Sequence, residues 1–152
     1  MVFYKAKNGD TGAIYSVEIP GGNEGNLDNF PHIALGENGL TESEESFEKI
    51  NLGDLSSFEE LYFVVCNYGE SSLGNKIDYN EFKGNLVITS NYSDVSLDNT
   101  YLLNLSSEEK KDVLILAKLE ICDNRYMLEN MNKVMTFDNF RETIPGATNF
   151  NI

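Results

Sequence analysis

The ten residues FEELYFVVCN (58–67) decide the fold. Side chains two apart in a strand share a face, and both faces of this stretch are apolar. One face carries Leu61, Phe63 and Val65, and the other carries Tyr62, Val64 and Cys66. A strand that is apolar on both faces is covered on both sides, which predicts a central position in a sheet.

The residues that follow alternate short apolar runs with turns. Residues 68–76 are polar and contain glycine, so we expect an irregular excursion. Two further strands are expected, one containing Leu86-Val87-Ile88 and one at 100–105, with a turn at 91–94 between them.

Residues 113–119 permit two interpretations. Their apolar side chains alternate as in a strand, and Asp123-Asn124 then leads into Tyr126-Met127-Leu128 as a hairpin return would. The alternative is a helix capped at Ser106-Ser107, where hydroxyls satisfy free N–H groups and the following acids suit the positive helix end. We favour strand–turn–strand.

The two ends of the chain complete the pattern. Val2-Phe3-Tyr4 and 13–19 flank Asn8-Gly9, a pair that suits a tight two-residue hairpin turn, and 23–31 is expected to be loop. The pattern of residues 136–143 predicts a helix, with Thr136 as its cap.

Many short strands separated by turns predict an all-β, two-layer antiparallel β-sandwich with a short C-terminal helix, in one domain spanning 1–152.

The stretch GENGLTESEESFEKINL (36–52) concentrates acidic side chains in a loop before a strand. The strand is expected at 47–52, with a bulge or a start at Lys49, because Phe47 and Ile50 break the alternation. Such a loop is either a site for a hard cation or a solvated turn. Its acids are Glu37, Glu42, Glu44, Glu45 and Glu48.

Composition excludes several classes of protein. The 152 residues are 41% hydrophobic, so the chain is not a disordered one. Lys and Arg number 11 against 25 acids, a formal charge of −14. This charge repels nucleic acid and anionic membranes, and it attracts cations or a basic protein partner.

Cysteine usage and hydropathy indicate a cytoplasmic protein. Cys66 and Cys122 each lie in an apolar run without metal-ligand spacing, which predicts buried free thiols and no zinc site. No signal peptide is visible after Met1, and the longest apolar run, 113–119, is too short to span a bilayer.

Catalytic motifs are missing from the sequence. His32, the single histidine, has no Ser or Cys signature near it that would make it a general base. The glycines at 21–22 and 69–74 lack the Lys-Ser/Thr that follows in a phosphate loop. Aromatic residues such as Tyr62 and Tyr79 are expected in the core and on the sheet surface. We therefore expect no enzymatic activity.

The order of these segments resembles the TerD-type tellurium-resistance and stress-protein family. Residues 36–52 resemble its GDN-x-x-G…DDE stretch, and FEELYFVVCNY (58–68) resembles its I-x-F-V-V-x-I strand. DYNEFKGNLVITS (78–90) is similar to its S-F-x-x-V-x-x-A-x-I-x-L element, and 101–128 to its R-Y-D-L strand and hairpin. The resemblance covers about residues 36–143.

This resemblance implies a β-sandwich that binds calcium through acidic loops and acts in tellurite, stress or phage resistance. Glu37 and Asn38 match the Asp-Asn pair of the first acidic motif, and Glu44 and Glu45 match two acids of the second. Ser43 and the missing N-terminal D-x-D-L-D strand depart from the family and remove ligands from a site that needs six to eight oxygens. The calcium ligands expected here are Glu37, Asn38, Glu42, Glu44 and Glu45.

Three functions follow from these observations. The first is a non-enzymatic TerD-like stress or defence protein that binds calcium through the acidic loop. The second is a structural or interaction β-sandwich, of the phage or mobile-element type, whose acidic face docks a basic partner. The third is a small hydrolase whose site forms only on folding. An open sandwich edge left by the missing strands would favour a protein partner or a homo-oligomer.

Overall fold

The apolar stretch 58–67 forms β8 (Phe58–Val65), the middle strand of a five-stranded antiparallel sheet with the order β12-β11-β8-β1-β2. The other members are β1 (Val2–Ala6), β2 (Thr11–Ile14), β11 (Val113–Cys122) and β12 (Arg125–Met135). The computed structural model describes residues 1–36, 39–40, 46–79, 85–86, 103–104, 110–123 and 125–150.

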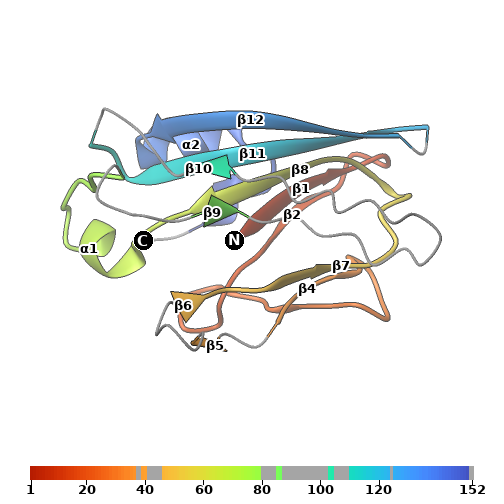
Figure 1. Cartoon of the computed structure of the whole chain (residues 1–152), viewed down its shortest axis with the longest axis horizontal. Coiled ribbons are helices and arrows are strands. Elements are labelled where there is room, and N and C mark those ends of the chain that lie inside the picture. The colour runs from red at the N-terminus through yellow and green to blue at the C-terminus, as the bar shows by residue number, and fades with distance from the viewer. Residues whose placement is uncertain are drawn as a thin grey trace.

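A smaller sheet forms the second layer (Figure 1). It has the order β3-β4-β7, and two short two-stranded ladders, β5–β6 and β9–β10, are also present. The bounds are β3 (Gly25–Asn26), β4 (Ile33–Leu35), β5 (Gly39–Leu40), β6 (Ser46–Phe47), β7 (Ile50–Leu52), β9 (Asn85–Leu86) and β10 (Leu103–Asn104). The predicted all-β antiparallel sandwich with a short C-terminal helix is confirmed.

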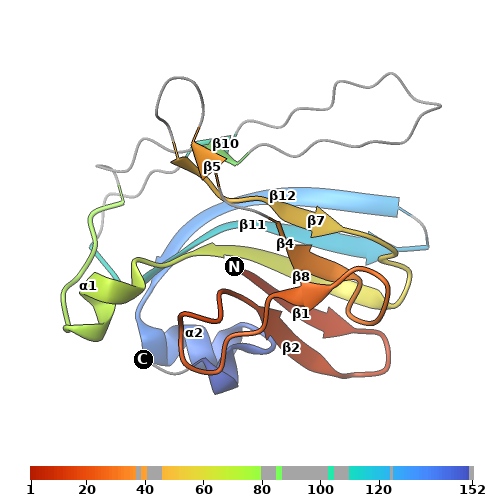
Figure 2. The ribbon, with the colours of Figure 1, turned by 90° about the horizontal axis from the view of Figure 1, so that it is seen from below.

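The described residues form three helical segments: α1 (Tyr68–Ser72), α2 (Phe137–Thr143) and the 3-10 turn η1 (Ala147–Asn149). Helix α2 lies on the side of the larger sheet away from β7 (Figure 2). It begins as predicted, because the Thr136 hydroxyl accepts the Asn139 N–H at 3.4 Å. Among the described residues, no helix has the length and apolar character needed to cross a bilayer.

Both faces of β8 are buried, as predicted. Leu61 and Phe63 belong to the core between the two sheets, which includes Ile33 of the smaller sheet. Tyr62 and Val64 belong to a second core on the opposite face, beneath α2 and η1. This second core contains a group of aromatic rings in edge-to-face contact: Phe3, Tyr15, Phe140 and Phe150.

The strand–turn–strand interpretation of 113–128 is confirmed, because β11 and β12 form a hairpin around Asp123. The alternative helix cap at 106–109 lies outside the described residues, as do most of the predicted strands at 86–88 and 100–105 and the whole turn at 91–94. Only β9 and β10 are described there, and they pair with each other.

Several predicted boundaries are wrong. The N-terminal hairpin has a three-residue loop, because the Ala6 carbonyl accepts from Gly9 N–H and Ala6 N–H donates to the Asp10 carbonyl. Strand β2 ends at Ile14 instead of residue 19, because turns at 16–22 follow and leave Val17 63% exposed. The predicted loop 23–31 contains β3.

Two further corrections concern residues 46–72. The predicted strand at 47–52 is interrupted at Glu48-Lys49, so β6 and β7 are separate strands. The polar excursion after β8 contains α1, which begins because the Asn67 side chain accepts the Glu70 N–H.

Only one of the two cysteines follows the prediction. Both thiols are free, and Cys66 is half-buried beside the second core. Cys122 is exposed, because it lies at the end of β11 next to the hairpin turn, where β8 no longer pairs with β11.

Glycine 146 determines how the C-terminal segment packs on β2. Gly146 and Gly74 have nearly the same positive φ, +83° and +82°. A Cβ at Gly146 would overlap the Gly12 carbonyl in β2, whereas a Cβ at Gly74 would meet nothing.

We expect Gly74→Ala to cost about 1–2 kcal/mol of unfolding free energy from the left-handed backbone alone. Gly146→Ala should cost about 1–3 kcal/mol more, from overpacking.

Urea unfolding of both variants measures this difference. Equal losses in the two variants would show that the C-terminal segment is not held against β2 by this close approach.

Candidate functional site

The residues predicted to bind calcium lie in the connection between β4 and β7, and all five fall outside the described residues: Glu37, Asn38, Glu42, Glu44 and Glu45. The strands that hold this connection are described. Leu35 pairs with Ile50, and the Gly36 N–H donates to the Lys49 carbonyl at 2.7 Å. The β5–β6 ladder continues the pairing, so residues 41–45 join two paired strands.

Within the described ranges, no group of three His, Cys, Asp or Glu side chains is placed to hold a metal ion. The predicted calcium site therefore depends on the five residues named above, and it stays a prediction.

A polar cavity of about 450 Å³ lies where α1, the start of β11 and the start of α2 meet. Hydroxyl and charged side chains line it, including Ser71, Ser72, Lys76, Asp112, Thr136 and Arg141. The cavity brings together residues from three segments that are far apart in sequence, so its polar contacts decide whether it is a reactive site.

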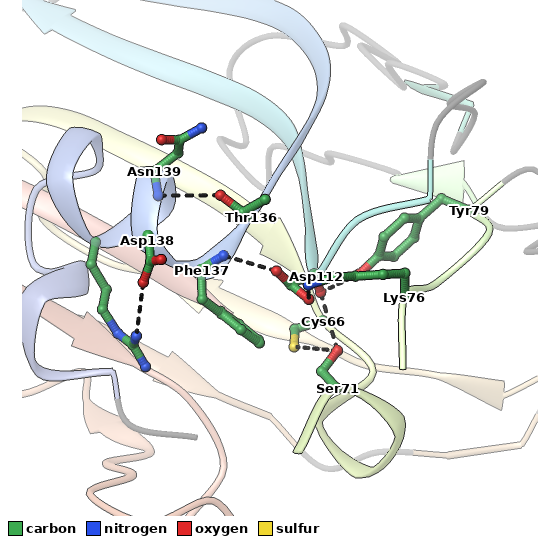
Figure 3. Close-up of polar contacts among 10 residues, drawn as sticks. Cys66, Ser71, Lys76, Tyr79, Asp112, Thr136, Phe137, Asp138 and Asn139 are labelled. Atoms are coloured by element: carbon green, nitrogen blue, oxygen red, sulfur yellow. Dashed lines mark hydrogen bonds and ion pairs between the residues drawn. The ribbon is translucent and has the colours of Figure 1, made fainter. Parts of the chain in front are cut away.

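Asp112 is the buried acid at this junction, with 3% of its surface exposed. One carboxylate oxygen contacts the Lys76 ammonium at 2.5 Å, and the other accepts the Phe137 N–H at 3.0 Å (Figure 3). Its backbone carbonyl accepts the hydroxyls of Tyr79, at 2.8 Å, and Ser71, at 3.3 Å. Asp112 thus links α1, β11 and α2.

The hydroxyl and thiol groups near Asp112 are engaged in structural contacts. Burial raises the pKa of the Cys66 thiol to about 11, which disfavours the reactive thiolate at neutral pH. Burial also raises the pKa of Tyr79. The Ser71 hydroxyl donates to a backbone carbonyl, which cannot act as a general base. This arrangement holds the fold together and does not activate a nucleophile.

His32 has a structural environment. Its Nδ1 lies 3.0 Å from the Leu27 carbonyl, and its backbone adopts a positive φ of 55°. Its N–H and C=O bond to Asn29 and Gly53, which fixes the turn that enters β4. These contacts account for a histidine at this position without a catalytic role.

A second candidate site is the acidic segment 8–48, defined as the stretch from Asn8 to Glu48. It contains no Lys or Arg. Its described parts include β2, β3, β4, β5 and β6. Five acids of the segment are described, and all are exposed: Asp10, Glu18, Glu24, Asp28 and Glu48. None of them takes part in an ion pair between described residues.

Three acids of the larger sheet, in contrast, contact lysine side chains. Lys5 contacts Glu59 at 2.6 Å, and Lys118 contacts Glu60 at 2.8 Å. Lys118 also contacts Glu120 at 2.6 Å, and these partners raise its pKa despite its burial. Lysines thus neutralise Glu59, Glu60 and Glu120, whereas none of the described acids of the segment has a Lys or Arg partner among the described residues.

Exposed apolar side chains accompany the acids of this segment. Val17 is 63% exposed, Phe30 is 47% exposed and Leu27 is 43% exposed. The Phe30 ring stacks on Phe58 with centroids 5.5 Å apart and meets Tyr4 edge-to-face at 5.8 Å. Phe30 is therefore held in place by the core while about half of it faces solvent.

Asp112 provides a direct test of the junction. Asp112→Ala removes the partner of Lys76 and of the Phe137 N–H, and we expect it to lower the unfolding free energy by about 2–3 kcal/mol, the cost of losing hydrogen bonds to a buried charge. Asp138→Ala is the matched control, since this carboxylate is 92% exposed and lies 3.9 Å from Arg141. It should cost at most about 0.5 kcal/mol. Chemical denaturation compares the two, and similar losses would contradict the structural role of Asp112.

The TerD-type resemblance was drawn from the order of segments between about 36 and 143. It stays a prediction about family and function. Searches of family models, of curated proteins and of solved structures found no match to this chain.

Proposed function

We propose that this chain is a binding protein whose acidic segment 8–48 docks a basic partner. The observation that carries the proposal is the concentration of exposed acids there without any Lys or Arg. Unpaired surface acids raise the local concentration of a cationic ligand and speed its association. Glu59, Glu60 and Glu120 of the larger sheet attract a cationic ligand less, because lysines already neutralise them.

The exposed apolar side chains define the chemistry of the partner further. Charge alone gives a weak and salt-sensitive encounter, whereas an aromatic anchor gives affinity. Phe30 is such an anchor, because its contacts with Phe58 and Tyr4 order the ring before binding. The partner is therefore a protein segment that combines Lys or Arg with apolar residues.

Charge reversal tests this proposal. The triple variant Glu18→Lys/Glu24→Lys/Asp28→Lys should weaken binding of a synthetic peptide of alternating Lys and Leu by about tenfold or more, equivalent to about 1.4 kcal/mol. Fluorescence anisotropy at several salt concentrations measures the affinity. The effect should shrink as salt screens the charges.

The matched control is Glu70→Lys/Asp138→Lys/Glu142→Lys, which changes the net charge equally at exposed acids outside the segment. If both triple variants lose the same affinity, the peptide senses only overall charge and the proposed docking site is wrong. Circular dichroism on heating confirms that both variants fold.

Calcium binding by the connection between β4 and β7 is a second candidate function. The supporting observation is that the connection starts and ends in paired strands, β4 with β7 and β5 with β6. Paired strands therefore flank the acidic stretch along the chain, and carboxylate and amide oxygens are the ligands that calcium takes. The resemblance to TerD-type proteins favours the same ion and a stress or defence role.

Calcium titration separates the two functions. If the connection binds calcium, a hundredfold excess over the dissociation constant should stabilise the fold by about 2.7 kcal/mol and raise Tm accordingly. Glu44→Ala/Glu45→Ala should abolish the shift, and Glu70→Ala/Glu142→Ala should retain it. An equal shift with magnesium would point to charge screening, and no shift would exclude the calcium site.

A further inference from the structure

Strand β12 forms one edge of the larger sheet (Figure 1). Within the described ranges it pairs with β11 alone. Asn132 has a positive φ of 43° where the β11–β12 register shifts, so a bulge divides the strand. The outer part, residues 125–130, is a regular strand without a bulge.

The direction of the backbone groups in β12 follows from hydrogen bonds deeper in the sheet. Val64 N–H donates to the Met1 carbonyl at 3.0 Å, so even-numbered residues of β8 face β1 and odd-numbered ones face β11. Leu61 therefore faces β11, where it lies opposite Leu119. Leu119 in turn faces β8.

The same alternation continues into the edge strand. Glu120, next to Leu119, faces β12 and lies opposite Met127. Met127 thus bonds to β11, and its neighbours Tyr126 and Leu128 direct their N–H and C=O groups away from the sheet. The outer part of β12 offers these groups to another strand.

We propose that two copies of this chain associate by antiparallel pairing of residues 125–130 of β12, with the two Met127 residues facing each other across a two-fold axis. Tyr126 then lies opposite the partner's Leu128, and this pair exchanges both backbone hydrogen bonds. An isologous interface of this kind must be self-complementary.

The charges in β12 select this register. With Met127 on the axis, Arg125 lies opposite the partner's Glu129, and the symmetry repeats the ion pair. The two neighbouring registers that also pair the outward groups centre on Tyr126 and on Leu128. The first leaves Arg125 opposite the partner's Met127, and the second leaves Arg125 opposite the partner's Met131, so neither pairs Arg125 with an acid.

Exposure and strand geometry agree with this interface. Tyr126 is 58% exposed and Met127 is 55% exposed, while Arg125 and Glu129 are also exposed. The bulge at Asn132 and the exposed Lys133 mark the end of the pairing segment, because both features disfavour strand addition. The interface is therefore confined to the outer part of β12 and does not use the acidic segment.

Sedimentation velocity over about a hundredfold range of protein concentration tests the proposal, because the dimer fraction must rise with concentration by mass action. The wild type should show a monomer–dimer equilibrium. Arg125→Glu and Glu129→Arg should each weaken it at least tenfold, since like charges then face each other. The double variant Arg125→Glu/Glu129→Arg should restore it.

Two controls complete the experiment. Lys133→Glu changes a charge in the same strand beyond the bulge and should leave the dimer unchanged. Tyr126→Pro removes an outward N–H without removing a bond to β11, and it should dissociate the dimer while circular dichroism shows a folded protein. A wild type that stays monomeric throughout, or single and double charge variants that behave alike, would overturn the proposal.

Discussion

The burial of β8 on both faces is the constraint on which the rest of the structure depends. One face completes the core between the sheets, and the other completes the core under α2 and η1. Neither face of the strand can therefore present a binding surface. Both proposed surfaces lie elsewhere, at the β12 edge of the larger sheet and in the acidic segment.

Charge is distributed in keeping with this arrangement. Acids on the larger sheet, such as Glu59 and Glu60, have lysine partners from neighbouring strands. Lys118 is mostly buried, with 15% of its side chain exposed, and it contacts two carboxylates. A charge in such a position needs partners because desolvation is costly. The five described acids of segment 8–48 are exposed to water, where they cost little and stay accessible to a ligand.

The features that the sequence predicts correctly are set by neighbouring residues. Alternation identifies β8 and β11, and the Thr136 hydroxyl identifies the start of α2. The Asp112 junction could not be predicted, because its partners, Lys76 and Phe137, are distant in sequence. The only local signal of this junction is an acid directly before an apolar strand. That signal does not indicate which N–H groups donate hydrogen bonds to the acid.

Local turns override the alternating pattern where the predicted end of β2 was wrong. The alternation of Tyr15, Val17 and Ile19 predicts a longer β2, yet turns bonded through Ser16 and Ile19 end the strand early. The same turns expose Val17 next to Glu18. The early end of β2 thus creates part of the acidic and apolar surface on which the proposed function rests.

The acidic segment includes the edge strand of the larger sheet opposite β12. Strand β2 belongs to the acidic segment and forms one edge, while β12 forms the other. In a dimer joined through β12, the two β2 strands would therefore lie at the far ends of a continuous sheet. Each copy could bind its own basic segment, and a partner with two such segments would gain affinity through effective concentration if its linker spans the sheet. Pairing at β12 would thus convert a weak, salt-sensitive contact into a bivalent one without any new contact to the partner.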